Sequence, residues 1–276
     1  MTELGILDIR SITGALEKLH PFDFKNLALT SFKRRLEYII EKYQFRGVDD
    51  LIKKLQTDKD FIDDFLYDLT IKGTELFRDP SLWRTIKTQI FDEIRNSIST
   101  YKIWFCGNST GEELYSFMIL LNQAGLRDKV KIYVSCLSSK GIDNIKEKTI
   151  DNKQFELSLS NYERISTSKP LLEYFSDKAN QRTLDTILGN NVEFIKENSI
   201  FENAPESINL VFLRNQMIYF NQILQEKFLG LIYRSLYTNG NLIIGVNESL
   251  ENTSYSKNFI KDSSGENIFK KKSNIR

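Results

Sequence analysis

The sequence predicts an α/β protein in which a small all-helical domain precedes a mainly parallel sheet covered by helices on both faces. The first seventy residues carry apolar side chains at helical spacing and show no strand pattern. From Tyr101 onward, short apolar strands alternate with amphipathic helices, and the chain closes with a hairpin-like pair of strands. The length of 276 residues suits a small domain joined to a medium one.

Helices are expected over residues 24–42, 51–55, 60–69 and 81–97. The first carries leucine, phenylalanine and isoleucine at roughly helical spacing, as an amphipathic helix does. Asp49 and Asp50 are suited to cap the second helix. The dipeptide Asp79-Pro80 breaks the helical pattern before the last helix begins.

The strands of the sheet are expected at residues 101–106, 130–136, 192–195, 208–213 and 241–246, with the closing hairpin at 258–261 and 267–272. Helices are expected at 112–124, 142–148 and 223–237, and Asn239-Gly240 is read as a turn. Sheets of this kind bind ligands at the carboxyl ends of their strands. The polar stretch 149–189 exceeds a minimal crossover and is a candidate subdomain or lid.

Composition excludes several classes of function. The chain has 38 Lys and Arg against 37 Asp and Glu, so no bulk charge attracts nucleic acid or an acidic membrane. Its apolar runs are far shorter than the ~20 residues of a membrane span, and no leader-like segment opens it. Two cysteines cannot form a disulfide framework, which fits a reducing cytoplasm. The single histidine, His20, is read as a loop residue and argues against a His-based metal site, so no metal is expected.

Three segments carry the chemistry. In FCGNSTGEELY (105–115), a strand ends in small residues and a helix then starts at Glu112 and Glu113, which are expected to border a ligand cleft. The alternative is that these two acids only favour the helix dipole. In LRNQMIYF (213–220), polar side chains follow a strand, although Asn215 could simply turn the chain and Tyr219 pack.

The third segment, TIKGTELFRDP (70–80), joins the helical part to the sheet part. Its polar residues Thr74 and Arg78 suit the wall of a cleft between domains, where ligand sites are common. A hinge without a ligand explains the same segment.

Taken together, these segments resemble the CheR-type chemoreceptor methyltransferases over nearly the full chain. The similar motifs are FDFKNLALTSFKRRLEYII, TELFRDP, NSTGEELYS, LRNQMIYFN and IGVNESL, and TELFRDP is closest to the TEMFRDP form of the family. The resemblance implies a helical domain followed by a Rossmann-like class I methyltransferase domain with an antiparallel C-terminal strand. It also implies S-adenosylmethionine (SAM) as cofactor and glutamate side chains of receptor coiled coils as acceptors.

The resemblance implies boundaries and residue roles as well. The helical domain would cover residues 1–72, a linker with the first helix of the cleft 73–98, and the methyltransferase domain 99–276 with a small subdomain at about 150–191. Arg78 and Tyr219 would lie nearest the acceptor carboxylate. The implied cofactor-binding residues are Thr74, Arg78, Gly107, Glu113, Cys136, Asn198, Ser199, Asn215 and Gln216.

One departure from the family pattern bears on activity. Cys136 stands where the family usually has an Asp that accepts hydrogen bonds from the ribose, and a thiol is a poor acceptor. Losing charge-assisted bonds costs about 1.5–3 kcal/mol, or roughly tenfold to a hundredfold in affinity. A catalytically degenerate CheR-like module that acts as a signalling interaction protein therefore stays an alternative. A nucleic-acid methyltransferase is a weaker one, because the chain has no basic excess.

The candidate partner surface is formed by the basic residues of the expected helix 24–42, namely Lys33, Arg34, Arg35 and Lys42. A solvated helix face is the plain reading, and the resemblance implies a landing surface for the cytoplasmic helical region of chemoreceptors. The stretch 149–189 lacks a glycine-rich tether loop, so no strong docking to a receptor C-terminal pentapeptide is expected. A cytoplasmic monomer is expected. Cys106 and Cys136 are read as small buried residues, with a redox pair as the alternative.

Overall fold

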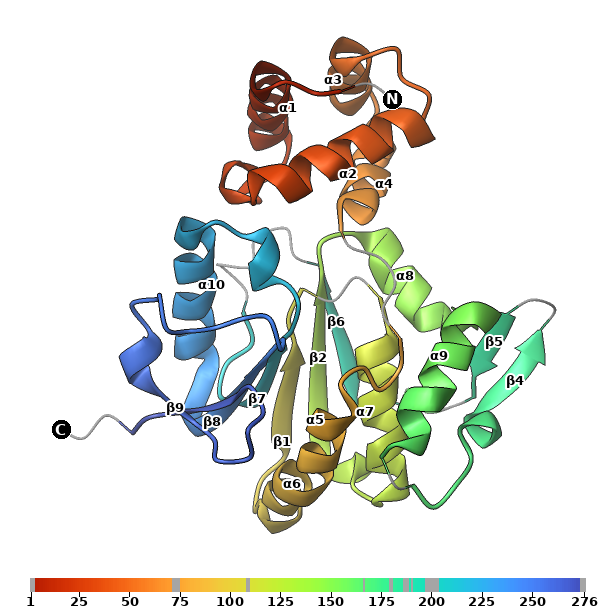
Figure 1. Cartoon of the computed structure of the whole chain (residues 1–276), viewed down its shortest axis with the longest axis vertical. Helices are drawn as coiled ribbons and strands as arrows, with labels where there is room; N and C mark the ends of the chain where they lie inside the picture. Colours follow the sequence, from red (N-terminus) through yellow and green to blue (C-terminus); the bar gives the residue numbers. More distant parts are fainter. Residues whose placement is uncertain are drawn as a thin grey trace.

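The computed structural model places a bundle of four helices against one edge of a larger α/β domain (Figure 1). It describes residues 3–70, 75–107, 110–165, 167–178, 181–185, 189, 191–196 and 204–273. The bundle consists of α1 (Ile6–Leu19), α2 (Leu29–Lys42), α3 (Val48–Thr57) and α4 (Lys59–Leu69). The apolar faces of its helices meet in one core around Leu16, Leu36 and Phe65, which are fully buried.

The first helix expected from the sequence is divided, and the expectation of one helix over 24–42 is wrong. Phe24–Asn26 forms a single 3-10 turn, the chain is extended at Leu27, and α2 begins only at Leu29. The break arises because Leu27 pairs with Phe220 of the α/β domain in an antiparallel bridge. Asp49 and Asp50 lie in the first turn of α3, after its N-cap Gly47, so they favour the helix dipole and do not cap it.

The α/β domain is built on a seven-stranded sheet of order β6-β2-β1-β7-β8-β10-β9. The strands are β1 (Tyr101–Phe105), β2 (Val130–Cys136), β6 (Val192–Lys196), β7 (Ile208–Leu213), β8 (Leu236–Ile244), β9 (Phe259–Lys261) and β10 (Ile268–Lys271). Strands β6, β2, β1, β7 and β8 are parallel, and β10 pairs antiparallel with both β8 and β9. The predicted fold class is confirmed.

One predicted turn lies inside a strand. Helix α10 (Gln222–Ser235) ends earlier than expected, and β8 runs from Leu236 through Asn239 and Gly240. The register between β7 and β8 shifts at this point, and Asn239 adopts a φ of +66°. A Cβ on Gly240 would lie 3.0 Å from the carbonyl oxygen of Ile208, so only glycine fits this irregularity.

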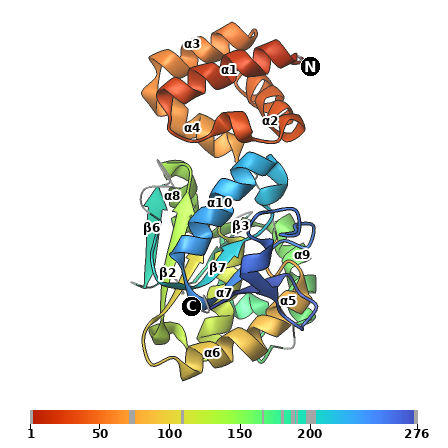
Figure 2. The same cartoon turned by 90° about the vertical axis from the view of Figure 1, so that its left-hand side faces the viewer.

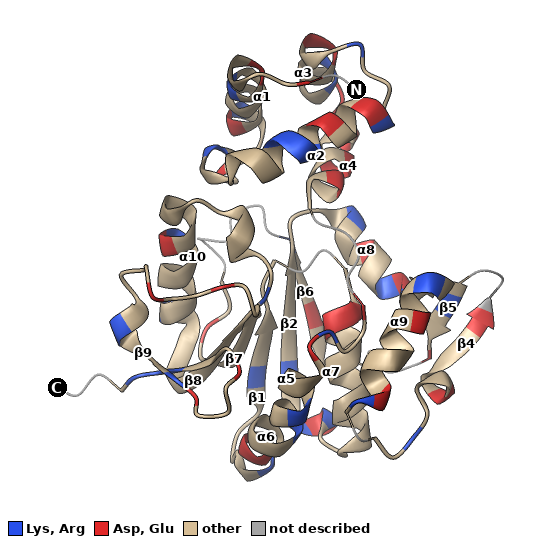
Figure 3. Ribbon diagram, in the orientation of Figure 1, with Lys and Arg blue, Asp and Glu red and all other residues tan. Residues whose placement is uncertain are grey.

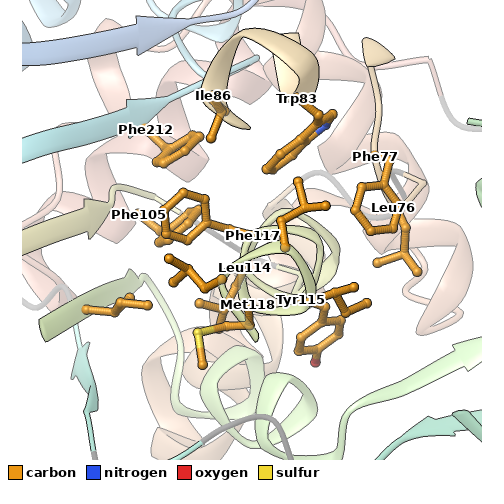
Figure 4. Packing of buried hydrophobic residues seen from close by; sticks show 14 of the residues in the cluster. Leu76, Phe77, Trp83, Ile86, Phe105, Leu114, Tyr115, Phe117, Met118 and Phe212 are labelled. Carbon is orange, nitrogen blue, oxygen red and sulfur yellow. The ribbon is translucent and has the colours of Figure 1, made fainter. Parts of the chain in front are cut away.

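Two apolar cores cover the faces of the sheet. One face is covered by a helical run and two further helices. The run consists of α5 (Pro80–Thr85), the π-helical segment Ile86–Ile90 and α6 (Phe91–Asn96), and the two helices are α7 (Glu112–Gln123) and α8 (Ser139–Glu147). Helix α10 covers the other face. Figure 4 shows the first core, where the rings of Phe105 and Phe212 stack with centroids 4.5 Å apart. Phe117 meets Phe212 edge-on at 5.5 Å. Such ring pairs add about 0.5–1.5 kcal/mol beyond area burial, so the ends of β1 and β7 are held rigidly side by side.

The polar stretch 149–189 folds beside α7, away from the main sheet (Figure 1). It contains α9 (Asn152–Glu163) and a three-stranded antiparallel sheet of order β3-β5-β4, with β3 (Thr149–Asp151), β4 (Phe175–Lys178) and β5 (Gln181–Leu184). Figure 2 shows the four-helix bundle standing over the end of the molecule to which the parallel strands point. None of the helices in the described ranges is long and apolar enough to cross a membrane.

Candidate active site

A cavity of about 360 Å³ lies between the four-helix bundle and the carboxyl edge of the sheet. On the sheet side it is lined by Gly107 after β1, Leu137 after β2 and Gln216 after β7. On the opposite side it is lined by α2, including Arg34 and Arg35. Its volume is typical of small-molecule sites, and it lies where open parallel sheets bind their ligands.

The loop after β1 brings bare backbone to this cavity. Gly107 adopts a φ of +66°, and a Cβ there would lie 3.3 Å from the Gln216 side chain. The Gly107 N–H donates to Ser135 Oγ at 3.2 Å, and its carbonyl accepts from Gln216 Nε2 at 2.9 Å. The loops after β1 and β7 and the end of β2 are thus bonded to one another beside the cavity, and glycine is the residue that permits it.

Arg214 joins the three sequence motifs. Its side chain is only 3% exposed, and it donates from Nη1 to Glu113 and from Nη2 to Asp79, each at 2.5 Å. Glu113 lies in the first turn of α7, Asp79 precedes α5, and Arg214 follows β7. One buried guanidinium therefore fixes Asp79, Glu113 and the loop after β7 relative to one another. Sequence reasoning did not assign this role to Arg214 or Asp79.

The segment around Arg78 has a strained backbone. Phe77 and Asp79 adopt φ values of +57° and +58°, a region that non-glycine residues rarely occupy. The fold holds this conformation: Phe77 N–H donates to Ser116 Oγ at 2.8 Å, and the Arg78 carbonyl accepts from Trp83 Nε1 at 2.8 Å. Strain of this kind costs about 1–3 kcal/mol per residue and is typical of functional sites.

Glu113 and Glu112 both lie outside the lining of the cavity, contrary to the expectation that these two acids border it. Glu112 is only 7% exposed and turns into the interior at the start of α7. Burial raises its pKa from 4.5 to about 7, and the charges of Glu75 and Asp151 act in the same direction. Glu113, in contrast, is half-buried, and its carboxylate forms an ion pair with Arg214.

The structure brings some of the implied site residues together and separates others. Gly107, Gln216 and Tyr219 line the cavity, whereas Arg78, Glu113 and Asn215 lie outside its lining. Cys136 is fully buried in the core on the α7 face, so Leu137 takes the place beside the cavity. The remaining implied residues, Thr74, Asn198 and Ser199, fall outside the described residues.

The two cysteines lie on opposite faces of the sheet. Cys136 belongs to the core covered by α7 and α8, while Cys106 belongs to the core covered by α10. Both are buried thiols. This placement supports the plain reading of two packing residues and gives no geometric support to a redox pair.

Basic and acidic residues both occur along α2 (Figure 3), and its basic side chains differ in their partners. Lys33 lies 3.5 Å from Glu3 and 3.7 Å from Glu37, and Lys42 lies 2.5 Å from the buried Asp68. Arg34 and Arg35 have no ion pair with any described residue and line the cavity instead. The helical spacing of the stripe Ser31, Arg34, Arg35 and Tyr38 is the sequence signal that could have found them.

Comparison with known proteins identifies the family of this chain. The family model for the CheR methyltransferase SAM-binding domain matches residues 72–265. The chain belongs to the CheR methyltransferase family. It is 29% identical to "Putative methyltransferase Cher3" of Pseudomonas putida, over 96% of this chain and 97% of that protein. It is 25% identical to chemotaxis protein methyltransferase 1 of Pseudomonas aeruginosa, over 79% of this chain and 81% of that one. The Listeria monocytogenes chemotaxis protein methyltransferase is 22% identical, over 81% and 82% of the two chains.

As a CheR family member, the protein is a SAM-dependent methyltransferase, and the cavity residues fit that cofactor. Gly107 lets a ligand approach the backbone, Gln216 offers an amide donor and acceptor, and Leu137 and Leu213 supply apolar surface for an adenine ring. No carboxylate occurs among the described residues that line the cavity. The bond that an acidic residue after β2 would make to a ribose hydroxyl is therefore not supplied by Cys136 or Leu137.

Proposed function

We propose that this CheR family protein transfers the methyl group of SAM to glutamate side chains in the cytoplasmic helical region of chemoreceptors. The observation that carries the proposal is the charge of the cavity. Of its described lining residues, the charged ones are Arg34 and Arg35, both on α2 and both without an ion-pair partner among described residues. Two such cations facing a cofactor loop favour an anionic acceptor. The relatives named chemotaxis methyltransferases support the same acceptor class.

The chemistry requires alignment more than acid–base catalysis. SAM supplies a methyl group on a positively charged sulfur when it is bound. A glutamate side chain is already ionised at neutral pH, so the protein needs no general base to make it a nucleophile. The task of the chain is to hold the carboxylate oxygen in line with the methyl group and to exclude water. The apolar side chains of Phe32, Leu137 and Phe220 that line the cavity suit that exclusion.

Four side chains are assigned to the acceptor. Arg34 and Arg35 attract and orient the acidic segment, and Tyr219 presents its ring and hydroxyl at the cavity wall. Arg78, which lies outside the cavity lining, is proposed to orient the acceptor carboxylate because the segment that carries it resembles the corresponding family motif. The partner implies action in the cytoplasm, and we propose a monomer that binds neither nucleic acid nor a membrane.

The test is methyl transfer from radiolabelled SAM to a purified cytoplasmic chemoreceptor fragment, with base-labile label as the sign of a glutamyl ester. Replacing both Arg34 and Arg35 by Glu is expected to lower kcat/KM at least about tenfold and to weaken its salt dependence. Lys53→Glu on α3, an exposed position away from the cavity, is the matched control and should retain wild-type kinetics. Wild-type rates in the double variant would sink the acceptor assignment.

A second candidate is the non-catalytic CheR-like interaction module. Burial of Cys136 at the position of the family's ribose-binding Asp favours it. Calorimetry with SAM and S-adenosylhomocysteine (SAH) separates the two candidates. Absence of binding at about 100 µM would favour the module, since a methyltransferase retains useful cofactor affinity after losing one contact.

A further inference from the structure

Glu248 holds two loops at the edge of the active site. Its carboxylate lies after β8 and is buried, with 6% exposure. Oε2 accepts the N–H of Gly245 at 2.6 Å and that of Asn215 at 2.9 Å, and Oε1 accepts the N–H of Ile218 at 3.3 Å. One carboxylate therefore binds backbone donors from its own loop and from the loop that follows β7.

The contact between the two loops leaves no room for adjustment. Asn215 adopts a φ of +57°, and a Cβ on Gly245 would lie 2.8 Å from Asn215 Nδ2 and 2.9 Å from Glu248 Oε2. Burial raises the pKa of the Glu248 carboxyl, and the N–H groups of both loops act in the opposite direction. A buried carboxylate that satisfies several backbone donors at once is costly to replace, because each donor would otherwise be left unpaired.

The C-terminal hairpin supports Glu248 from behind. Asn267, just before β10, donates from Nδ2 to the carbonyl of Gly245 at 2.8 Å and to that of Glu248 at 3.2 Å. Its own carbonyl accepts the N–H of Ile244 at 3.1 Å. The antiparallel strands at the edge of the sheet thus fix the loop that carries Glu248.

On the other side, the loop held by Glu248 carries two cavity residues. Gln216 precedes the 3-10 turn Met217–Tyr219 and Tyr219 is its last residue, with the Tyr219 N–H donating to the Gln216 carbonyl at 3.0 Å. The Gln216 side chain reaches the Gly107 carbonyl. The N–H groups of Asn215 and Ile218 that Glu248 binds lie on either side of Gln216.

We propose that Glu248 is a positioning residue for methyl transfer, which sets the turn of residues 215–219 so that Gln216 and Tyr219 face the cavity. This inference rests on the proposed function of that cavity. Glu248 touches neither cofactor nor acceptor in this account and acts through the backbone that it binds. A purely structural role would stabilise the fold without changing turnover in the folded enzyme.

The experiment compares Glu248→Gln with Glu226→Gln. The glutamine keeps one acceptor oxygen, which can serve Asn215 and Gly245, but its amide group opposes the N–H of Ile218. We expect kcat to fall on the order of tenfold to a hundredfold, while the dissociation constant of SAH changes less than about threefold. Glu226 is the matched control: its carboxylate also holds backbone, the N–H of Ser254 at 2.7 Å, but lies away from the cavity lining. Its variant should keep the wild-type kcat.

Three results would overturn the inference: a wild-type kcat in Glu248→Gln, an equal loss in Glu226→Gln, or unchanged amide hydrogen exchange over residues 213–221 in the Glu248 variant. The exchange measurement needs no methyl acceptor. If the wild-type protein methylates no receptor, the proposed function fails and hydrogen exchange still decides whether Glu248 orders the turn. Should Glu248→Gln not fold, Asn267→Ala is the second variant, with a smaller loss of kcat in the same direction expected.

Discussion

Ionisation of Glu112 is expected to lower the stability of the protein as the pH rises from mild acid to neutrality. Its carboxyl group is buried, and its Oε2 atom has no hydrogen-bond partner among the residues that the structure describes. Desolvation by burial raises its pKa from 4.5 to about 7, against the opposing hydrogen bond from Thr110. The perturbation that isolates this group is Glu112→Gln, which keeps the size of the side chain and removes its ionisation.

The magnitude follows from the two pKa values. The unfolded chain releases the proton near pH 4.5, but the folded chain holds it until about pH 7. Because the folded pKa is raised, the stabilisation is fully present below pH 4.5 and is lost as the pH rises to about 7. The difference between the unfolded pKa of 4.5 and the folded pKa of about 7 corresponds to a contribution of about 3 kcal/mol to the free energy of unfolding.

Urea unfolding at about pH 8 and about pH 4.5 measures the effect. We expect the free energy of unfolding of Glu112→Gln to exceed that of the wild type by about 2–3 kcal/mol at the higher pH and to equal it at the lower pH. Glu156→Gln, at an exposed position on α9, controls for the loss of a surface charge and should show no such pH dependence. A difference between Glu112→Gln and wild type that is equal at both pH values would refute the reasoning.

Three further substitutions test the site. Gly107→Ala places a Cβ against Gln216 at a φ of +66°. We expect it to weaken the free energy of SAH binding by about 1–2 kcal/mol, which calorimetry would record as roughly tenfold lower affinity. Arg214→Met leaves two carboxylates without their buried partner and should lower the free energy of unfolding by about 3–5 kcal/mol in urea. Cys136→Asp places a carboxylate at a fully buried position and should lower the melting temperature without improving SAH affinity.

Each of these substitutions has an outcome that contradicts it. Unchanged SAH affinity in Gly107→Ala would remove that loop from the cofactor site. Partial recovery of Arg214→Met by a second substitution, Glu113→Gln, is expected from the ion-pair geometry, and no recovery would speak against it. A stable Cys136→Asp variant with tighter SAH binding would mean that this side chain reaches the ribose after all.

The order of strands and helices could be read from the sequence because it depends on local patterns. Apolar runs such as 101–106 and 208–213 alternate with amphipathic helices, and such segments have one way to bury their faces. The loops after these strands were placed correctly at one sheet edge for the same reason. Gly107 and Tyr219 accordingly lie in the lining of the cavity, while the roles that the resemblance implies for them stay predictions.

The features that the sequence did not reveal depend on contacts between distant segments. The helix expected from residue 24 breaks at Leu27 because Phe220 pairs with it, and no local pattern marks that partner. Arg34 and Arg35 were assigned to an outer surface because α2 reads as a charged helix, and only the packing of the bundle turns them to the cavity. The partners of Arg214 likewise come from two segments far away in the chain.

The short bridge between the bundle and the loop after β7 has an evolutionary consequence. Ala28 donates its N–H to the carbonyl of Tyr219 at 2.7 Å, and the N–H of Asn221 donates to the carbonyl of Asn26 at 2.9 Å. The segment that carries Tyr219 is thus bonded directly to the segment that leads into α2, with its two cavity arginines. Under the proposed function, this bridge couples the choice of acceptor to the methyl transfer itself. A chimera that exchanges the bundle for that of another family member must carry over both sides of this bridge, or it will move Tyr219 as it changes the acceptor.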